Sequence, residues 1–148
     1  MSRSNIHLEI AINASKEHIW EVLFGKETFT EWASEFAEGS HLEGDLKEGR
    51  TVCFLDASQK GIRSKVIVHK PSEKITFHHN GVIFKGSVDT EGEEAKKWIG
   101  IEEAYLLNQT GENQYLFIVD VGIEKEYEEM FTESWQRAIE RLKQLCEQ

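Results

Sequence analysis

Adjacent histidines and adjacent glutamates are the side chains of this sequence that could do acid–base chemistry. The pairs are His78-His79 and Glu102-Glu103. An imidazole beside a carboxylate can move a proton, provided that both face the same site. Neighbouring residues of a strand point to opposite faces, so only one member of each pair can face a shared cavity. Alternation from Ile75 favours His79, whereas the sheet register that would place a glutamate beside it is not readable from the sequence.

Other catalytic or ligating patterns do not occur in the sequence. The adjacent histidines cannot share one ion unless a bulge intervenes, and no HxxxH or HExxH spacing is present. There is no GxSxG nucleophile elbow, no phosphate loop and no GxGxxG. Cys53 lies in the apolar run Thr51–Leu55, which indicates an inert core thiol. We therefore expect no catalytic constellation, no metal site and no cofactor.

Composition limits the partners that can bind. The chain has 148 residues, 39% hydrophobic and 30% charged, which predicts one globular domain over residues 1–148. Its net charge of −10 repels phosphates, so neither nucleic acid nor a membrane surface is expected as a partner. No apolar run is long enough to span a bilayer, and the start lacks an apolar signal region. We expect a cytoplasmic location; the oligomeric state stays open.

Alternation and cap chemistry predict the elements that open the chain. Every second residue over 6–12 is apolar, which is typical of a half-buried strand. Ser15 can accept hydrogen bonds at the start of a helix that is expected to stop at Gly25. Thr28 and Glu31 have the spacing of a capping box. They predict the start of a second short helix.

Short extended runs then follow at the spacing of an antiparallel sheet. With the opening strand they predict a sheet of about six to seven strands, the runs falling at 41–42, 51–55, 61–69, 74–84 with a break at Gly81, 101–109 and 114–121. The acidic stretch 86–97 is predicted to be a solvated connection with a helical turn near Glu93.

A long helix starting near Glu124 is the clearest element of the sequence. Its apolar residues follow helical spacing: Tyr127, Met130, Phe131, Trp135, Ala138, Ile139, Leu142 and Leu145. Acidic residues gather in its first half and basic residues in its second, and Glu133 with Arg137 has the spacing of an ion pair. An antiparallel sheet buries one face. We therefore predict an α+β fold in which this helix crosses the curved sheet and closes a pocket.

Four segments carry a resemblance to a known family: Ile10–Leu23, Leu42–Gly49, Val68–Phe77, and the closing helix with Phe131, Trp135 and Leu142. In this order they resemble the helix-grip fold of the START-like (SRPBCC) superfamily, which includes the birch-pollen-allergen-like proteins. Within it the chain is most similar to the branch of the activator of the heat-shock-protein-90 ATPase.

That resemblance implies a cavity between the sheet and the long helix. Relatives use such cavities for lipids, sterols or polyketide intermediates, and a few are cyclases or hydrolases. Three hypotheses follow: a module that binds a small apolar ligand, a cyclase- or hydrolase-like enzyme that uses a cavity His or Glu, and an interaction module that acts on a chaperone or another protein.

Aromatic residues are abundant, and most are expected to fill the core. The predicted ligand-binding residues lie on the inner face of the last helix and on the strands opposite: Phe77, His79, Tyr105, Phe131 and Trp135. An apolar cavity with isolated polar groups would favour the binding hypothesis. A His–Glu hydrogen bond in the cavity would favour the enzyme, and a filled cavity beside an exposed apolar patch the interaction module.

Overall fold

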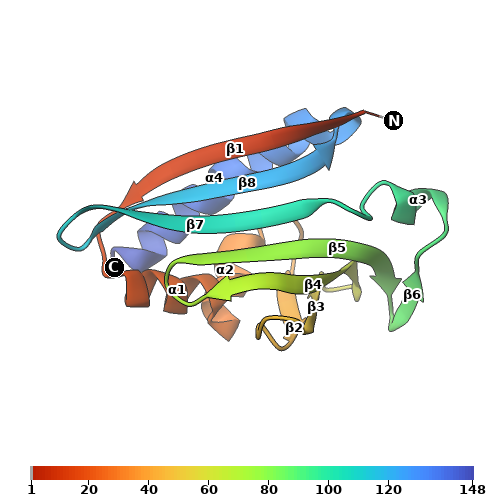
Figure 1. The fold of residues 1–148 in the computed structure, drawn as a ribbon, viewed down its shortest axis with the longest axis horizontal. Helices are drawn as coiled ribbons and strands as arrows, with labels where there is room; N and C mark the ends of the chain where they lie inside the picture. The colour runs from red at the N-terminus through yellow and green to blue at the C-terminus, as the bar shows by residue number, and fades with distance from the viewer. Residues whose placement is uncertain (1) are drawn as a thin grey trace.

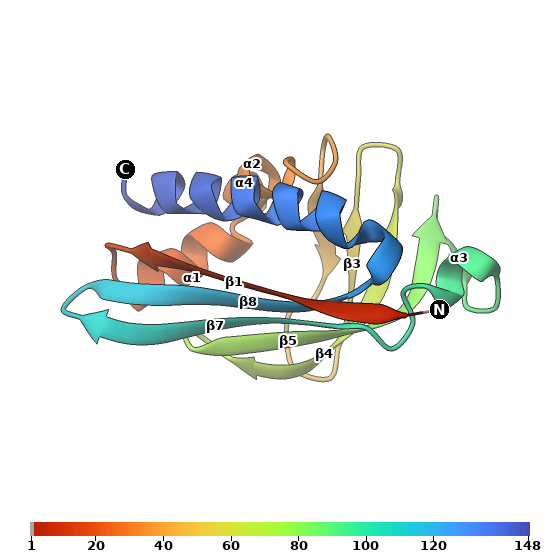
Figure 2. The same ribbon diagram turned by 90° about the horizontal axis from the view of Figure 1, so that it is seen from above.

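The computed structural model describes residues 2–148 as a curved antiparallel sheet with helices on one of its faces (Figure 1, Figure 2). The sheet has eight strands: β1 (Arg3–Ile12), β2 (His41–Gly44), β3 (Thr51–Leu55), β4 (Lys60–Lys70), β5 (Lys74–Phe84), β6 (Ser87–Asp89), β7 (Glu102–Gly111) and β8 (Gln114–Glu124). The helices are α1 (Lys16–Phe24), α2 (Lys26–Ala33), α3 (Glu93–Lys96), the 3₁₀ turn η1 (Lys125–Tyr127) and α4 (Glu128–Cys146). The predicted α+β fold is confirmed. No helix within residues 2–148 is both long and apolar enough to cross a membrane.

The first and last strands of the chain are neighbours in the sheet. Its strand order is β1-β8-β7-β5-β4-β3-β2, with β6 paired to β5. Figure 1 shows β1 and β8 side by side, and Ile6 lies opposite Val121 in their register. The short strand β6 falls in the acidic stretch that the sequence predicts to be a solvated connection. All of β6 is exposed, and the predicted helical turn follows it as α3.

Local sequence explains the first elements, with one correction. Ile6 and Ile12 of β1 are buried, as their alternation predicts, and the Ser15 hydroxyl accepts the backbone N–H of His18 at the start of α1. The predicted capping box at Thr28 is wrong. Helix α2 begins at Lys26 with Gly25 as its N-cap, and the Thr28 hydroxyl instead donates to the Gly25 carbonyl at 3.3 Å.

Gly25 explains why α2 begins so early. Its backbone N–H donates to the Glu21 carbonyl at the end of α1, and its own carbonyl accepts the N–H of Phe29 in α2, both at 2.8 Å. The same residue therefore ends one helix and starts the next, which leaves no linker for a separate side-chain cap.

Helix α4 lies across the sheet on the same side as α1 and α2 (Figure 2). Its buried stripe includes Trp135, Ala138, Ile139 and Leu142, which confirms most of the predicted apolar face. Met130 was predicted to belong to that face, but it is 58% exposed. The predicted start near Glu124 is wrong, because β8 continues to that residue. Glu124 is 3% exposed, and pairing with β1 holds it in the sheet, so the helix begins only after η1.

Ion pairs attach α4 to the second helical segment. Arg141 contacts Glu31 of α2 at 2.8 Å, and Arg137 contacts Glu35 just beyond α2 at 3.2 Å. The ion pair that spacing predicts between Arg137 and Glu133 does not form within residues 2–148, because Arg137 contacts Glu35 instead. These contacts hold the two helices together over the inner face of the sheet.

A bulge shifts the register in the middle of the sheet. Ser64 of β4 lies opposite His79 of β5, but Arg63 lies opposite Gly81, so Asn80 is the extra residue. The Asn80 side-chain carbonyl accepts the Nε–H of Arg63 at 2.8 Å. Strand β5 therefore continues through Gly81, where the sequence predicts a break, and the bulge bends the strand at that point.

Candidate functional site

A cavity of about 560 Å³ lies between the inner face of the sheet and helices α2 and α4. Most of its lining is apolar, and aromatic rings are frequent: Phe29, Trp32, Phe36, Phe54, Phe84, Trp98, Tyr105, Phe131 and Trp135. A lining of this kind with a few polar groups is typical of small-molecule sites. The protein's own side chains do not fill this space.

Aromatic contacts fix the shape of the deep wall. Trp135 of α4 packs edge to face against Phe36, with ring centroids 4.8 Å apart, and lies 5.8 Å from Tyr105 of β7. Trp32 of α2 completes the group, and its indole N–H donates to the Leu23 carbonyl at 3.1 Å. Rings from two helices and a strand therefore pack together to form this wall.

Four of the five residues predicted to bind a ligand line the cavity: His79, Tyr105, Phe131 and Trp135. Phe77 does not line it. Its ring is fully buried behind the wall, with centroids 5.0 Å from Phe54 and 5.8 Å from Tyr105. Alternation along β5 predicted that Phe77 would face the cavity. The ring of Phe54 lines the cavity instead and packs against Phe77.

Sequence reasoning did not select several other lining residues. Phe36 comes from the irregular segment after α2, Phe54 from the short strand β3, and Trp98 from the segment after α3. A family pattern of lining positions could have found them, whereas periodicity could not, since none lies in a long regular element.

A chain of polar side chains crosses the floor of this apolar space. The Ser64 hydroxyl lies 2.6 Å from Nδ1 of His79. On the other side of the ring, Nε2 lies 3.7 Å from a carboxylate oxygen of Glu103. The second oxygen of Glu103 accepts the Tyr105 hydroxyl. The predicted meeting of His79 with a cavity-facing glutamate therefore occurs, although their separation exceeds a hydrogen bond.

Strand alternation places His78 and Glu102, the neighbours of His79 and Glu103, outside the cavity. His78 and Glu102 are direct partners in the register of β5 and β7, and their side chains meet at 3.2 Å on the solvent face. His79 is 2% exposed, whereas the side chain of His78 is 40% exposed. The two histidines thus face opposite sides of the sheet, as their adjacency predicts.

Burial sets the protonation of two groups near the site. Burial, and next the Glu103 carboxylate, raises the pKa of Tyr105 well above its usual range, so its hydroxyl stays protonated and donates. Burial also raises the pKa of the half-buried Cys53 thiol, with a smaller contribution from Glu43. The free Cys53 thiol is therefore a weak nucleophile.

The cavity has a mouth beside β6 and α3. Lys60, Phe84, Ser87, Asp89 and Glu94 line this end and are exposed. Phe84 is 50% exposed although it is a large apolar residue. A ligand would therefore enter past an apolar ring, two carboxylates and one ammonium group, and the net negative charge disfavours a strongly anionic molecule.

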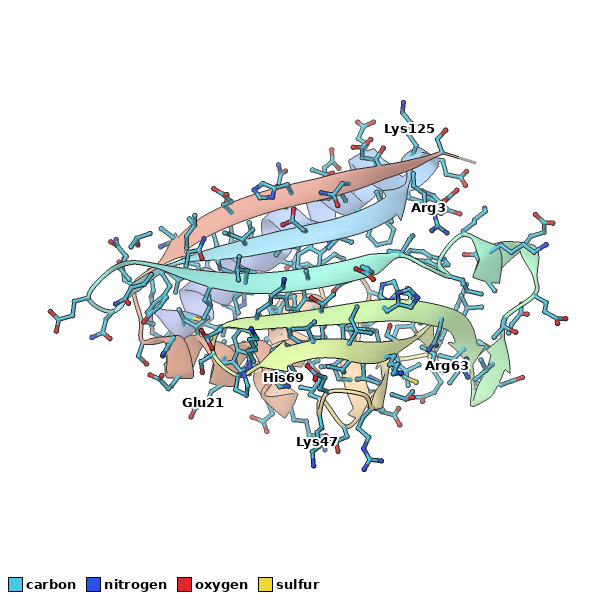
Figure 3. The ribbon with its side chains drawn as sticks, viewed as in Figure 1. Arg3, Glu21, Lys47, Arg63, His69 and Lys125 are labelled. Carbon is cyan, nitrogen blue, oxygen red and sulfur yellow. The ribbon has the colours of Figure 1, made fainter. Side chains whose placement is uncertain are left out.

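Arg3 holds the segment next to this mouth (Figure 3). Its Nε donates to Glu124 at 2.9 Å, and one terminal nitrogen donates to the carbonyls of Lys96 and Ile99 at 3.1 and 2.8 Å. The guanidinium thus joins β1 and β8 to the loop that carries Trp98. A second anchor lies at the far end, where the Trp20 indole donates to His69 at 3.2 Å.

No family model matches the sequence, and no curated protein matches it either. Solved structures do match. The Aha1 dimer from Colwellia psychrerythraea is 21% identical, with a TM-score of 0.68 over 97% of this chain and 96% of that one. CalU16 from Micromonospora echinospora is 15% identical, with a TM-score of 0.66 over 96% and 75%. Protein MLL2253 from Mesorhizobium loti is 14% identical, with a TM-score of 0.71 over 96% of both chains.

These likenesses concern the fold. At such identities the shared feature is the course of the backbone, and it confirms the helix-grip architecture that the sequence predicts. The chemistry of the cavity depends on the residues of this chain that line it.

Proposed function

We propose that this protein binds a small, largely apolar molecule in the cavity between the sheet and α4. The observation that carries the proposal is the cavity itself, about 560 Å³ of space bounded mainly by aromatic and aliphatic side chains. Protein interiors normally pack without such voids. A space of this size, open at one end, is therefore best explained by a ligand that fills it.

Two features separate this function from the alternatives. A dedicated interaction module would not need an open cavity behind its surface. An enzyme that used His79 with Glu103 would be favoured by a hydrogen bond between them, but these side chains stand 3.7 Å apart. The polar groups on the floor instead form one isolated cluster within an apolar lining, which supports binding.

A neutral fluorescent probe tests the proposal. N-phenyl-1-naphthylamine brightens in apolar surroundings, and we expect saturable enhancement with the wild-type protein. Ala37→Trp adds a large side chain at a residue that lines the cavity. Because the indole occupies the space that the probe needs, we expect binding to weaken by about tenfold or more.

Ala104→Trp is the matched control. Ala104 lies between Glu103 and Tyr105 of β7, which both line the cavity, so its own side chain points to the opposite face of the sheet. This variant should bind the probe like the wild type. A wild-type protein that gives no saturable signal, or an Ala37→Trp variant that binds equally well, would contradict the proposal.

A further inference from the structure

Two polar atoms on the cavity floor have no hydrogen-bond partner within residues 2–148. They are Nε2 of His79 and Oε1 of Glu103, and they lie 3.7 Å apart. Every fully buried polar side-chain atom of the described chain has a hydrogen-bond partner, so these two atoms must be accessible. Since both residues line the cavity, the atoms are open to whatever occupies it.

Neighbouring side chains fix the orientation of both groups. Ser64, directly opposite His79 in the sheet, holds the other ring nitrogen at 2.6 Å. Tyr105, which is 1% exposed, donates its hydroxyl to the other oxygen of Glu103. The free nitrogen and the free oxygen are thus held in place before any ligand arrives, which lowers the entropic cost of binding.

Electrostatics decide what this pair offers. A bare Nε2 lone pair facing a carboxylate oxygen at 3.7 Å would be repelled, so the proton of the ring sits on Nε2. The Ser64 hydroxyl then donates to Nδ1. The floor therefore presents one N–H donor from His79 beside one carboxylate acceptor from Glu103.

We propose that His79 and Glu103 form a recognition site for a hydroxyl group on the apolar ligand, an inference that rests on the proposed function. The hydroxyl oxygen accepts the Nε2–H of His79 and its proton is donated to Oε1 of Glu103. A single alcohol or phenol group supplies both roles. The rest of the molecule lies against Phe131, Trp135 and the other apolar lining residues.

Other ligand groups fit the pair less well. A ketone or ether oxygen can accept from His79 but leaves the Glu103 carboxylate desolvated and unpaired, which is costly. A carboxylate on the ligand would be repelled by Glu103. An ammonium on the ligand has only donors, so it cannot accept the N–H of His79. A hydrocarbon satisfies neither atom. Sites built to bond a hydroxyl reject analogues that lack it more strongly than apolar pockets reject a change in size.

Displacement of N-phenyl-1-naphthylamine by 4-decylphenol and by 4-decylanisole tests the assignment. The two competitors share a flexible chain and differ in whether the oxygen can donate. A hydrogen bond to a charged group should let the phenol displace the probe at about tenfold lower concentration than the ether. Glu103→Gln should reduce that difference to about threefold or less, because the phenol loses its charged acceptor and the ether no longer leaves a carboxylate unpaired.

Glu102→Gln is the matched control, since Glu102 lies on the solvent face of the same strand and should keep the full preference. Circular dichroism verifies that each variant is folded. Should Glu103→Gln fail to fold, Glu103→Leu removes the acceptor and should abolish the preference equally, whereas His79→Leu removes a bond open to both competitors and should weaken both. Equal displacement by the two competitors in the wild type overturns the hydroxyl site but leaves apolar binding intact. Absence of probe binding overturns both.

Discussion

Ser64 Oγ lies 2.6 Å from Nδ1 of His79, directly across the boundary between β4 and β5. Both residues are almost fully buried, at 0% and 2% exposure. Within residues 2–148 neither side chain has another hydrogen-bond partner. This contact therefore determines how the imidazole is presented to the cavity.

Ser64→Ala should destabilise the protein by about 1–3 kcal/mol, because Nδ1 of a buried histidine loses its partner. Urea unfolding measures the change, with an unchanged m-value showing that the unfolded state is not altered. Ser87→Ala, on the exposed strand β6, should leave the unfolding midpoint within error. Equal midpoints for Ser64→Ala and the wild type would show that the contact is energetically unimportant.

Helix α4 offers a comparison of a buried and an exposed residue. Leu142 is 0% exposed and packs in the core, whereas Met130 is 58% exposed. Leu142→Ala should cost roughly 2–5 kcal/mol of unfolding free energy through lost burial and the space left behind. Met130→Ala should change it by less than about 0.5 kcal/mol. Similar losses in the two variants would mean that α4 does not pack as described.

His7 on the outer face of β1 gives a prediction about pH. The Asp120 carboxylate, and then Glu9, bond its ring nitrogens and raise the pKa of His7 above its ordinary 6.5. Because the folded pKa is raised, this stabilisation is fully present below pH 6.5 and is lost as the pH rises through the folded value.

NMR titration of the His7 ring should therefore give a midpoint above 6.5. Asp120→Asn should lower that midpoint, whereas Glu102→Gln, which faces His78 instead, should not. A midpoint that does not respond to Asp120→Asn would refute the contact.

The two free cysteines should differ in reactivity. Burial, and secondarily Glu147, raises the pKa of Cys146 to about 12, and the residue is 3% exposed. Cys53 is only half-buried. Iodoacetamide at neutral pH should therefore label Cys53 first, and Cys146 only on unfolding, as peptide mass spectrometry can measure. If the folded Cys53→Ser variant took up label as fast as the folded wild type, this order of reactivity would be contradicted.

Local periodicity by itself determined the longer elements of this protein. Alternation in β1 and the apolar stripe of α4 depend on residues two, three and four positions apart, so they are readable without knowing what they pack against. The covering of an antiparallel sheet by the long helix follows from the same patterns. The ends of helices and strands were harder to predict, because they depend on contacts with neighbouring elements. Gly25 joins two helices, and pairing with β1 keeps Glu124 in the sheet.

Only the tertiary structure decided which side chains share the cavity. His79 meets Ser64 because Ile67 is an extra residue of β4 between the hairpin turn and this pair, and Asn80 of β5 shifts the register back beyond it. Glu103 joins them because β7 pairs with β5 on the other side. Register depends on long-range pairing and on these two extra residues, neither of which leaves a periodic trace in the sequence. The sequence therefore specified the sheet and its helix, and the fold assembled the polar floor beneath them.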